Sequence, residues 1–164
     1  TMDIWAIPVK RTYQPNAPKM AEIMRDFLAD IGVGVNVINL DWNTFRRRIA
    51  ERNYDSILIG WAANNGDPDN FYRPLLSCAS VETGSNRANW CSPQFDELID
   101  EALTYTDETT RAALYQSANA LIADQIPLVP IAHAYQYQAY VDQVEGLVIN
   151  PFGGIRFGGV HKSQ

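Results

Sequence analysis

The N-terminal part of the chain alternates between strand-like and helix-like patterns, and this alternation restricts the fold more than any other feature. Short apolar or β-branched runs at 3–9, 33–40 and 56–61 indicate strands. Between them lie two segments whose apolar residues recur at helical spacing, 20–31 and 42–49. A β-α-β-α-β order favours parallel strands joined by right-handed crossovers. The sequence therefore predicts an α/β fold with a mixed, mostly parallel sheet flanked by helices.

The helix starts carry recognisable signals, and the C-terminal part is expected to be extended. Asp41 and Asp107 can each cap a helix, and the Ser-Pro pair at 92–93 is typical of an N-cap followed by a first-turn proline. Apolar and polar residues alternate at 135–141, which predicts a half-exposed strand. A further strand is expected at 144–149.

A polar stretch, 64–92, separates the third strand from the later helices. It is dense in Asn, Gly, Asp and Pro, which favour leaving a regular element, so the sequence predicts a long loop. In open α/β sheets, ligands bind outside the carboxyl ends of the strands, which is where this loop begins. We therefore place the candidate site here. The alternative is a long surface loop without a function.

The chain has only two cysteines, Cys78 and Cys91, and both lie in this polar stretch. Neither a Cys-x-x-Cys pair nor a nearby histidine accompanies them, which argues against a zinc site. A disulfide that closes a loop of about 15 residues stabilises a fold by roughly 3 kcal/mol in the chain-entropy model. We expect a disulfide, and with it an oxidising compartment; the alternative is two free buried thiols in a cytosolic protein.

Composition excludes several classes of function. The net charge of −6 argues against nucleic acid as a partner, because phosphate binding depends on clustered Lys and Arg. Glycine loops for nucleotides and nucleophile motifs are absent from the sequence, and its two histidines are far apart. Asp67 and Asp69 weakly suggest an oxygen-rich calcium loop, but Pro68 separates them and no glutamate follows at the required position. We expect neither a metal nor a cofactor.

The remaining features favour recognition of a ligand. Arg11 and Asn64 each follow a predicted strand end, and parallel strands would bring both to one crevice. The planar guanidinium of an arginine suits a carboxylate. The two aspartates of the loop are further candidates, and they are also the residues on which a hydrolase would depend. The candidate ligand-binding residues are Arg11, Trp61, Asn64, Asp67, Asp69 and Phe71; no catalytic residue is assigned.

The chain as a whole resembles a known family, the bacterial dipeptide- and oligopeptide-binding proteins of ABC importers, solute-binding family 5. The similarity is to their C-terminal lobe, and it rests on the runs at 8–16, 20–22, 60–61, 66–71, 76–78 and 89–91. Further runs are similar to the Sap-type branch, which is linked to uptake of antimicrobial peptides: 41–48, 71–78, and 146–148 with 151–153.

The resemblance implies a periplasmic receptor that closes two lobes on its ligand and does no chemistry. Residues 1–164 would be its C-terminal ligand-binding lobe, and its partners would be a peptide, the N-terminal lobe and a membrane ABC permease. In the dipeptide-binding members, an arginine matching Arg11 holds the peptide carboxylate, and an aspartate matching Asn64 holds the amino group. The asparagine departs from that pattern, which puts free dipeptides in doubt as ligands. The resemblance also leaves haem or another non-peptide ligand as an alternative.

Overall fold

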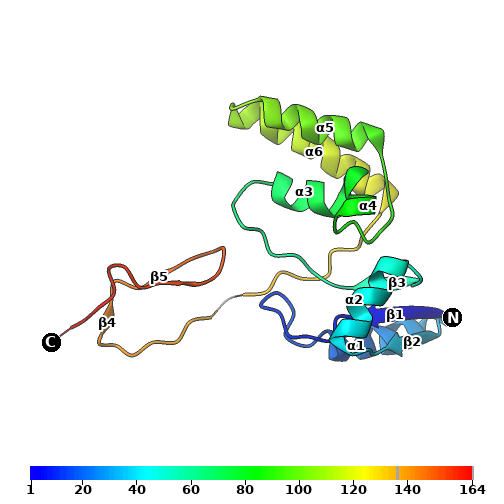
Figure 1. Cartoon of the computed structure of the whole chain (residues 1–164), viewed down its shortest axis with the longest axis horizontal. Coiled ribbons are helices and arrows are strands. Elements are labelled where there is room, and N and C mark those ends of the chain that lie inside the picture. The colour runs from blue at the N-terminus through cyan, green and yellow to red at the C-terminus, as the bar shows by residue number, and fades with distance from the viewer. Residues whose placement is uncertain (136, 164) are drawn as a thin grey trace.

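The computed structural model describes residues 1–135 and 137–163. Seven short strands and six helices follow one another along this part of the chain (Figure 1). Their order is β1 (Met2–Ala6), α1 (Ala17–Asp30), β2 (Val35–Ile38), α2 (Trp42–Glu51), β3 (Ser56–Leu58), α3 (Asp69–Leu76), α4 (Ala79–Thr83), α5 (Pro93–Thr104), α6 (Glu108–Gln125), β4 (Val144–Glu145), β5 (Val148–Ile149), β6 (Ile155–Arg156) and β7 (His161–Lys162).

The first three strands form a parallel sheet in the order β2-β1-β3, which confirms the expected α/β arrangement. Ile4 of the central strand pairs with Val37 on one side and with Ser56 on the other. Three consecutive residues of β1, Ile4 to Ala6, are buried. A continuous buried run is typical of a parallel strand that is covered on both faces.

The predicted helix starts are confirmed by their capping hydrogen bonds. The side chain of Asp41 accepts from the N–H groups of Asn43 and Thr44, and that of Asp107 accepts from the N–H of Thr110. Ser92 caps α5 in the same way, through the N–H of Phe95. Each bond satisfies a backbone donor that the first turn of a helix leaves without an intrahelical partner.

Helix α1 is seated differently from the expected apolar stripe. Its buried positions are Ala17 and Ala21, whereas Phe27 and Ile31 are 70% and 74% exposed. The alanines face the core together with Met24 and Leu28 of the expected stripe, while Phe27 and Ile31 face solvent. The helix face predicted from spacing alone was therefore only partly correct.

The expected loop at 64–92 is wrong in its second part, because it contains α3 and α4. Pro68 starts α3: its φ of −56° is already helical, and its carbonyl accepts from the N–H groups of Phe71 and Tyr72. The same Gly-Asp-Pro-Asp composition that makes turns also makes helix starts, which is why the pattern was ambiguous. The loop that remains after β3 runs from 59 to 68.

The sheet and its helices α1 and α2 lie below helices α3 to α6 (Figure 1), and each of these two layers has its own hydrophobic core. The first joins the sheet to α1 and α2 around Phe45, and the second joins α3, α5 and α6 around Phe95. Hydrogen bonds connect the two layers: Tyr54 Oη donates to the carbonyl of Arg87 at 2.9 Å, and the guanidinium of Arg52 donates to the carbonyl of Val81.

After α6 the chain leaves this compact body as a tail, residues 127–163 without Gln136 (Figure 1). The strand expected at 135–141 is wrong for the residues that are described there, and the one expected at 144–149 is divided into β4 and β5 by a turn at Gly146. The tail strands pair antiparallel in two small ribbons, β4 with β7 and β5 with β6.

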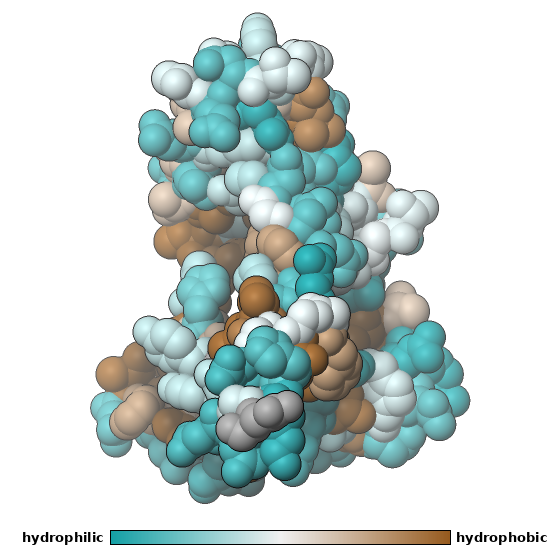
Figure 2. Space-filling view, turned by 90° about the vertical axis from the view of Figure 1, so that its left-hand side faces the viewer, coloured by the Kyte–Doolittle hydropathy of each residue, from teal (hydrophilic) through white to brown (hydrophobic). Residues whose placement is uncertain are grey.

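Seen from the side of the tail, apolar surface gathers in the lower half of the molecule (Figure 2). Within the described residues, none of the helices is both long and apolar enough for a membrane span.

Cys78 and Cys91 form a disulfide with their Cα atoms 4.4 Å apart, as expected. The bond ties the junction of α3 and α4 to the segment before α5.

We predict that alkylation without reduction labels neither cysteine and that reduction lowers the free energy of unfolding by about 3 kcal/mol. The double variant Cys78→Ser/Cys91→Ser should show the same loss and no further response to reductant. Two alkylated cysteines in unreduced protein would contradict the pairing.

Candidate ligand-binding site

Three loops follow the carboxyl ends of the parallel strands, and these ends lie at one edge of the sheet. Arg11 belongs to the loop after β1, Trp42 begins the helix after β2, and Asn64 belongs to the loop after β3. This is the edge at which open α/β sheets bind ligands, and it is where the sequence placed the site.

Arg11 is held at this edge by its backbone and by an aromatic ring. Its N–H and carbonyl pair with Gln14 at 3.0 and 3.1 Å, which closes a tight turn. Its guanidinium lies 5.1 Å from the ring centroid of Trp42, within the range of a cation–π contact. Among the described residues no carboxylate pairs with Arg11, so its donors are available for an anion. Trp42 was not among the residues predicted for the site; its signal in the sequence is an aromatic residue shortly after a strand end.

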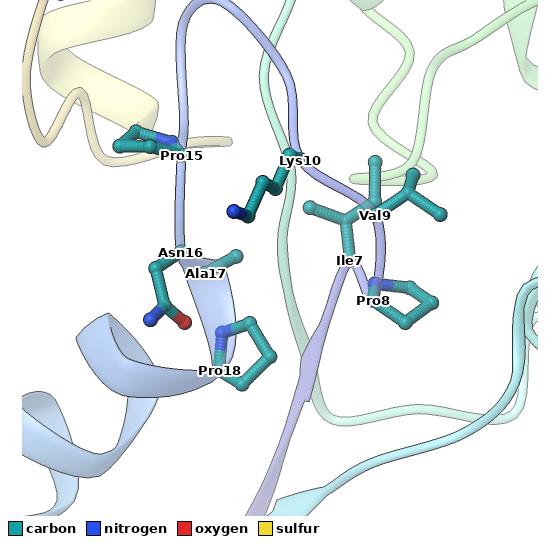
Figure 3. Close-up of a pocket in the computed structure, with 8 residues that line it drawn as sticks. All are labelled: Ile7, Pro8, Val9, Lys10, Pro15, Asn16, Ala17 and Pro18. Atoms are coloured by element: carbon teal, nitrogen blue, oxygen red, sulfur yellow. The ribbon is translucent and has the colours of Figure 1, made fainter.

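A small hollow lies beside the Arg11 loop, between residues 7–10 and 15–18 (Figure 3). The side chain of Lys10 extends across the opening between the two arms of the loop. The hollow measures about 150 Å³. Sites for small molecules usually measure about 300–1,000 Å³, so this hollow alone is too small for a peptide.

The loops after β1 and β3 are packed against each other through Tyr13 and Gly60. A Cβ at residue 60 would lie 2.5 Å from Cδ2 of Tyr13, so only glycine leaves room for the ring. This contact brings the Arg11 loop next to the loop that carries Asn64. In the described part of the chain no hydrogen bond joins Arg11 directly to Asn64. The sequence signal for the contact was a glycine at the end of a strand.

Trp61 and Asn64 are both held by Asn70 in the first turn of α3. The indole Nε1 of Trp61 donates to the carbonyl of Asn70 at 2.8 Å, and the N–H of Asn64 donates to Asn70 Oδ1 at 3.1 Å. In a regular helix the carbonyl of residue 70 would accept from the N–H of residue 74. Residue 74 is Pro74, which has no N–H, so this carbonyl is left for the indole.

Asp67 turns away from the edge and pairs with α6. Its Oδ2 lies 2.6 Å from Nη2 of Arg111, and its Oδ1 accepts from Tyr115 Oη at 3.3 Å and from the N–H of Asp69 at 3.0 Å. Burial acts to raise the pKa of Asp67, but the hydrogen bonds from these three groups and the charge of Arg111 outweigh it and hold the pKa below its usual value. Asp67 is therefore a carboxylate that already has a cationic partner.

Asp69 is also paired with an arginine, whereas the apolar side chain of Phe71 is partly exposed to solvent. Asp69 Oδ2 accepts from Nε of Arg73 at 3.1 Å, one turn along α3, and Arg73 also donates to Asp100 of α5 at 2.8 Å. Phe71 leaves 40% of its surface exposed. The sequence could not reveal the partners of Asp67, because Arg111 and Tyr115 lie 44 and 48 residues away.

We predict that Gly60→Ala lowers the free energy of unfolding by about 1–3 kcal/mol, because the new methyl group meets the ring of Tyr13. Thermal unfolding measures the loss. Gly158→Ala serves as the control, since a Cβ there would meet nothing within 4 Å. In a Tyr13→Ala background the Gly60→Ala change should cost much less, which is the signature of a direct contact. An equal loss in both backgrounds would contradict the packing of the two loops.

Comparison with known proteins gives a consistent result. The model of the bacterial extracellular solute-binding proteins, family 5 Middle, matches residues 4–83. The dipeptide-binding protein of Escherichia coli strain K12 is 37% identical over 157 residues, which are 96% of this chain and 29% of that protein. The probable ABC transporter periplasmic-binding protein SapA of the same strain is 34% identical over 164 residues, 100% of this chain and 30% of that protein.

A solved structure shows that the likeness extends to the fold. The dipeptide-binding protein from Pseudoalteromonas sp. SM9913, in complex with Met-Leu, superposes with a TM-score of 0.83 at 50% identity and covers 99% of this chain and 32% of that protein. The chain thus spans less than a third of the length of the proteins that it matches. In sequence and in fold this chain is similar to bacterial dipeptide-binding and Sap-type periplasmic-binding proteins, and its residues 4–83 match the model of the extracellular solute-binding proteins of family 5.

Proposed function

We propose that this chain supplies one lobe of a periplasmic receptor that binds peptides without chemical turnover and passes them to a membrane ABC permease. The main support for the proposal is the guanidinium of Arg11, which contacts the ring of Trp42 at the carboxyl edge of the sheet. Among the described residues it has no acidic partner. A relative named for dipeptide binding and a similar structure solved with Met-Leu support the same class of ligand.

The exposed side chains of the tail argue for a second lobe. Tyr135, Tyr137 and Phe157 are 84%, 90% and 70% exposed, and large apolar side chains exposed in succession usually mark an interface. We propose that the compact lobe ends near Gln125 and that the tail packs on the remainder of the receptor. This narrows the expectation that residues 1–164 form one lobe. The tail leaves the compact lobe on the side toward which the loops after β1 and β3 project (Figure 1). It also comes close to the loop after β3, because a Cβ on Gly66 would lie 3.7 Å from Phe152 of the tail.

The chemistry of the edge suggests how a peptide would lie. The guanidinium of Arg11 suits the peptide carboxylate, and Trp61 and Phe71 offer aromatic surface for a side chain. Asn64 offers a carbonyl oxygen that can accept from an amino group but cannot neutralise its charge. The proposed ligand residues are therefore Arg11, Trp61, Asn64 and Phe71.

Neither alternative function gains support from the geometry. A hydrolase that uses Asp67 or Asp69 would need a carboxylate available to the substrate, and both are paired with arginines. A haem receptor would be expected to offer an axial ligand, and both histidines lie on the tail, where His161 is 3.4 Å from Glu145.

The direct test is titration calorimetry of the full-length receptor with Met-Leu, followed by mass analysis of the recovered peptide. We predict binding, unchanged peptide, and an affinity at least about tenfold weaker for Arg11→Gln, since a hydrogen-bonded ion pair contributes about 1.5–3 kcal/mol. Arg47→Gln, the same change on an exposed face of α2, is the control and should bind as the wild type does. Hydrolysed peptide, or equal affinity for Arg11→Gln, would refute the proposal.

A second prediction concerns Asn64. Because Asn64 carries no charge and the nearby acids are paired, the receptor should bind N-acetyl-Met-Leu with an affinity close to that for Met-Leu. Asn64→Asp should favour the free amino end by about tenfold, since a hydrogen bond between two charged groups is roughly twice as strong as a neutral one. A strong preference for the free amine in the wild type, unchanged by Asn64→Asp, would show that another acid meets the amino group.

A further inference from the structure

The loop after β3 is fastened at two points, and the first lies at its upstream end. Asn70 holds Trp61 through its backbone carbonyl and Asn64 through its side chain. A third hydrogen bond, from the N–H of Asp67 to Asn65 Oδ1 at 3.0 Å, closes the turn between these positions. Together they give the segment 61–67 a fixed shape, but all of them are local to the loop and the first turn of α3.

The second point is the contact of Asp67 with α6. Arg111 donates from Nη2 both to Asp67 and to Tyr115 Oη, and from Nε to the carbonyl of Ala102 at the end of α5. Its guanidinium also lies 5.6 Å from the ring of Tyr115, which is itself 6% exposed. Arg111 is thus built into the junction of α5 and α6, and Asp67 attaches the loop to this junction.

We propose that Asp67 is a positioning residue: its ion pair with Arg111 fixes the segment 61–67, and with it Asn64, against the α5–α6 junction, and Asp67 does not itself bind the ligand. The inference rests on the proposed peptide site. Both carboxylate oxygens of Asp67 already have partners, and a ligand ammonium would have to approach against the charge of Arg111, 2.6 Å away. Binding to a loop that is already ordered avoids the entropy lost when a mobile loop is immobilised.

The test compares Asp67→Asn and Arg111→Gln, singly and together, in the full-length receptor. Calorimetry with Met-Leu should show about tenfold weaker binding for each variant at unchanged stoichiometry, and the double variant should be no weaker than either single one. Misfolding alone would lower the fraction of competent protein and leave the affinity of the remainder unchanged. Arg111→Lys keeps the charge opposite Asp67 and should recover part of the affinity lost in Arg111→Gln.

Hydrogen exchange of the backbone amides of 61–67 gives a second measurement that needs no ligand. Both single variants should exchange faster in this segment than the wild type. The control is Asp100→Asn, which removes a carboxylate paired with Arg73 and touches no residue of the loop; it should change neither affinity nor exchange in 61–67.

Three results would overturn the inference. Weaker binding by Asp67→Asn with unchanged or tighter binding by Arg111→Gln would show that Asp67 meets the ligand directly. Unchanged affinity in both variants would show that the ion pair does not position the site. Unchanged hydrogen exchange in 61–67 would show that the loop is ordered without the ion pair. The exchange measurement decides this even if the wild type binds no Met-Leu, because a lack of binding refutes only the proposed function.

Discussion

Parallel pairing of β1, β2 and β3 places the ends of all three strands at one edge, and the candidate site depends on this constraint more than on any one side chain. The carboxyl-terminal half of the central strand, Ile4 to Ala6, is apolar and buried, so it offers no polar side chain to a ligand at this edge. Polar groups must therefore come from the loops that follow the strands. A loop holds a side chain accurately only if it is itself held, and here the Tyr13–Gly60 packing and the Arg11–Trp42 contact do so.

The helical layer decides the charge of this edge. The loop and the start of α3 contain two aspartates, and each is paired with an arginine from the helices, Arg111 or Arg73. The charges of these aspartates are compensated locally, whereas Arg11, like Lys10 in the same loop, has no acidic partner among the described residues. Arg11 is exposed here, but if the proposed second lobe closes over this edge, a charge left without a partner would cost several kcal/mol, so a ligand that brings a carboxylate is favoured over one that brings only an ammonium. The specificity we propose thus follows from where the acids are already engaged.

Local patterns predicted local structure well. The positions of the first three strands, the caps at Asp41, Ser92 and Asp107, and the disulfide depend on residues close in sequence, and the structure confirms them. Helix α3 was missed because its starting residues also favour turns. The engagement of Asp67 could not be predicted, since its partner is 44 residues away and no local period connects the two. The described residues of 135–141 do not form the expected strand, for a related reason: alternation shows that a strand would suit a half-buried surface, but not that such a surface is present.

The open edge and the exposed tail are two aspects of one arrangement. The hollow beside Arg11 is too small for a peptide, so the edge needs a second wall. The tail needs a body that covers its aromatic side chains, and it passes the edge closely enough for Phe152 to approach Gly66. A body that packs on the tail is thereby brought opposite Arg11 and Asn64. In the receptor that we propose, one further lobe would bury the apolar tail and close the ligand site together, and the tail would then help to set the distance between the walls of the cleft.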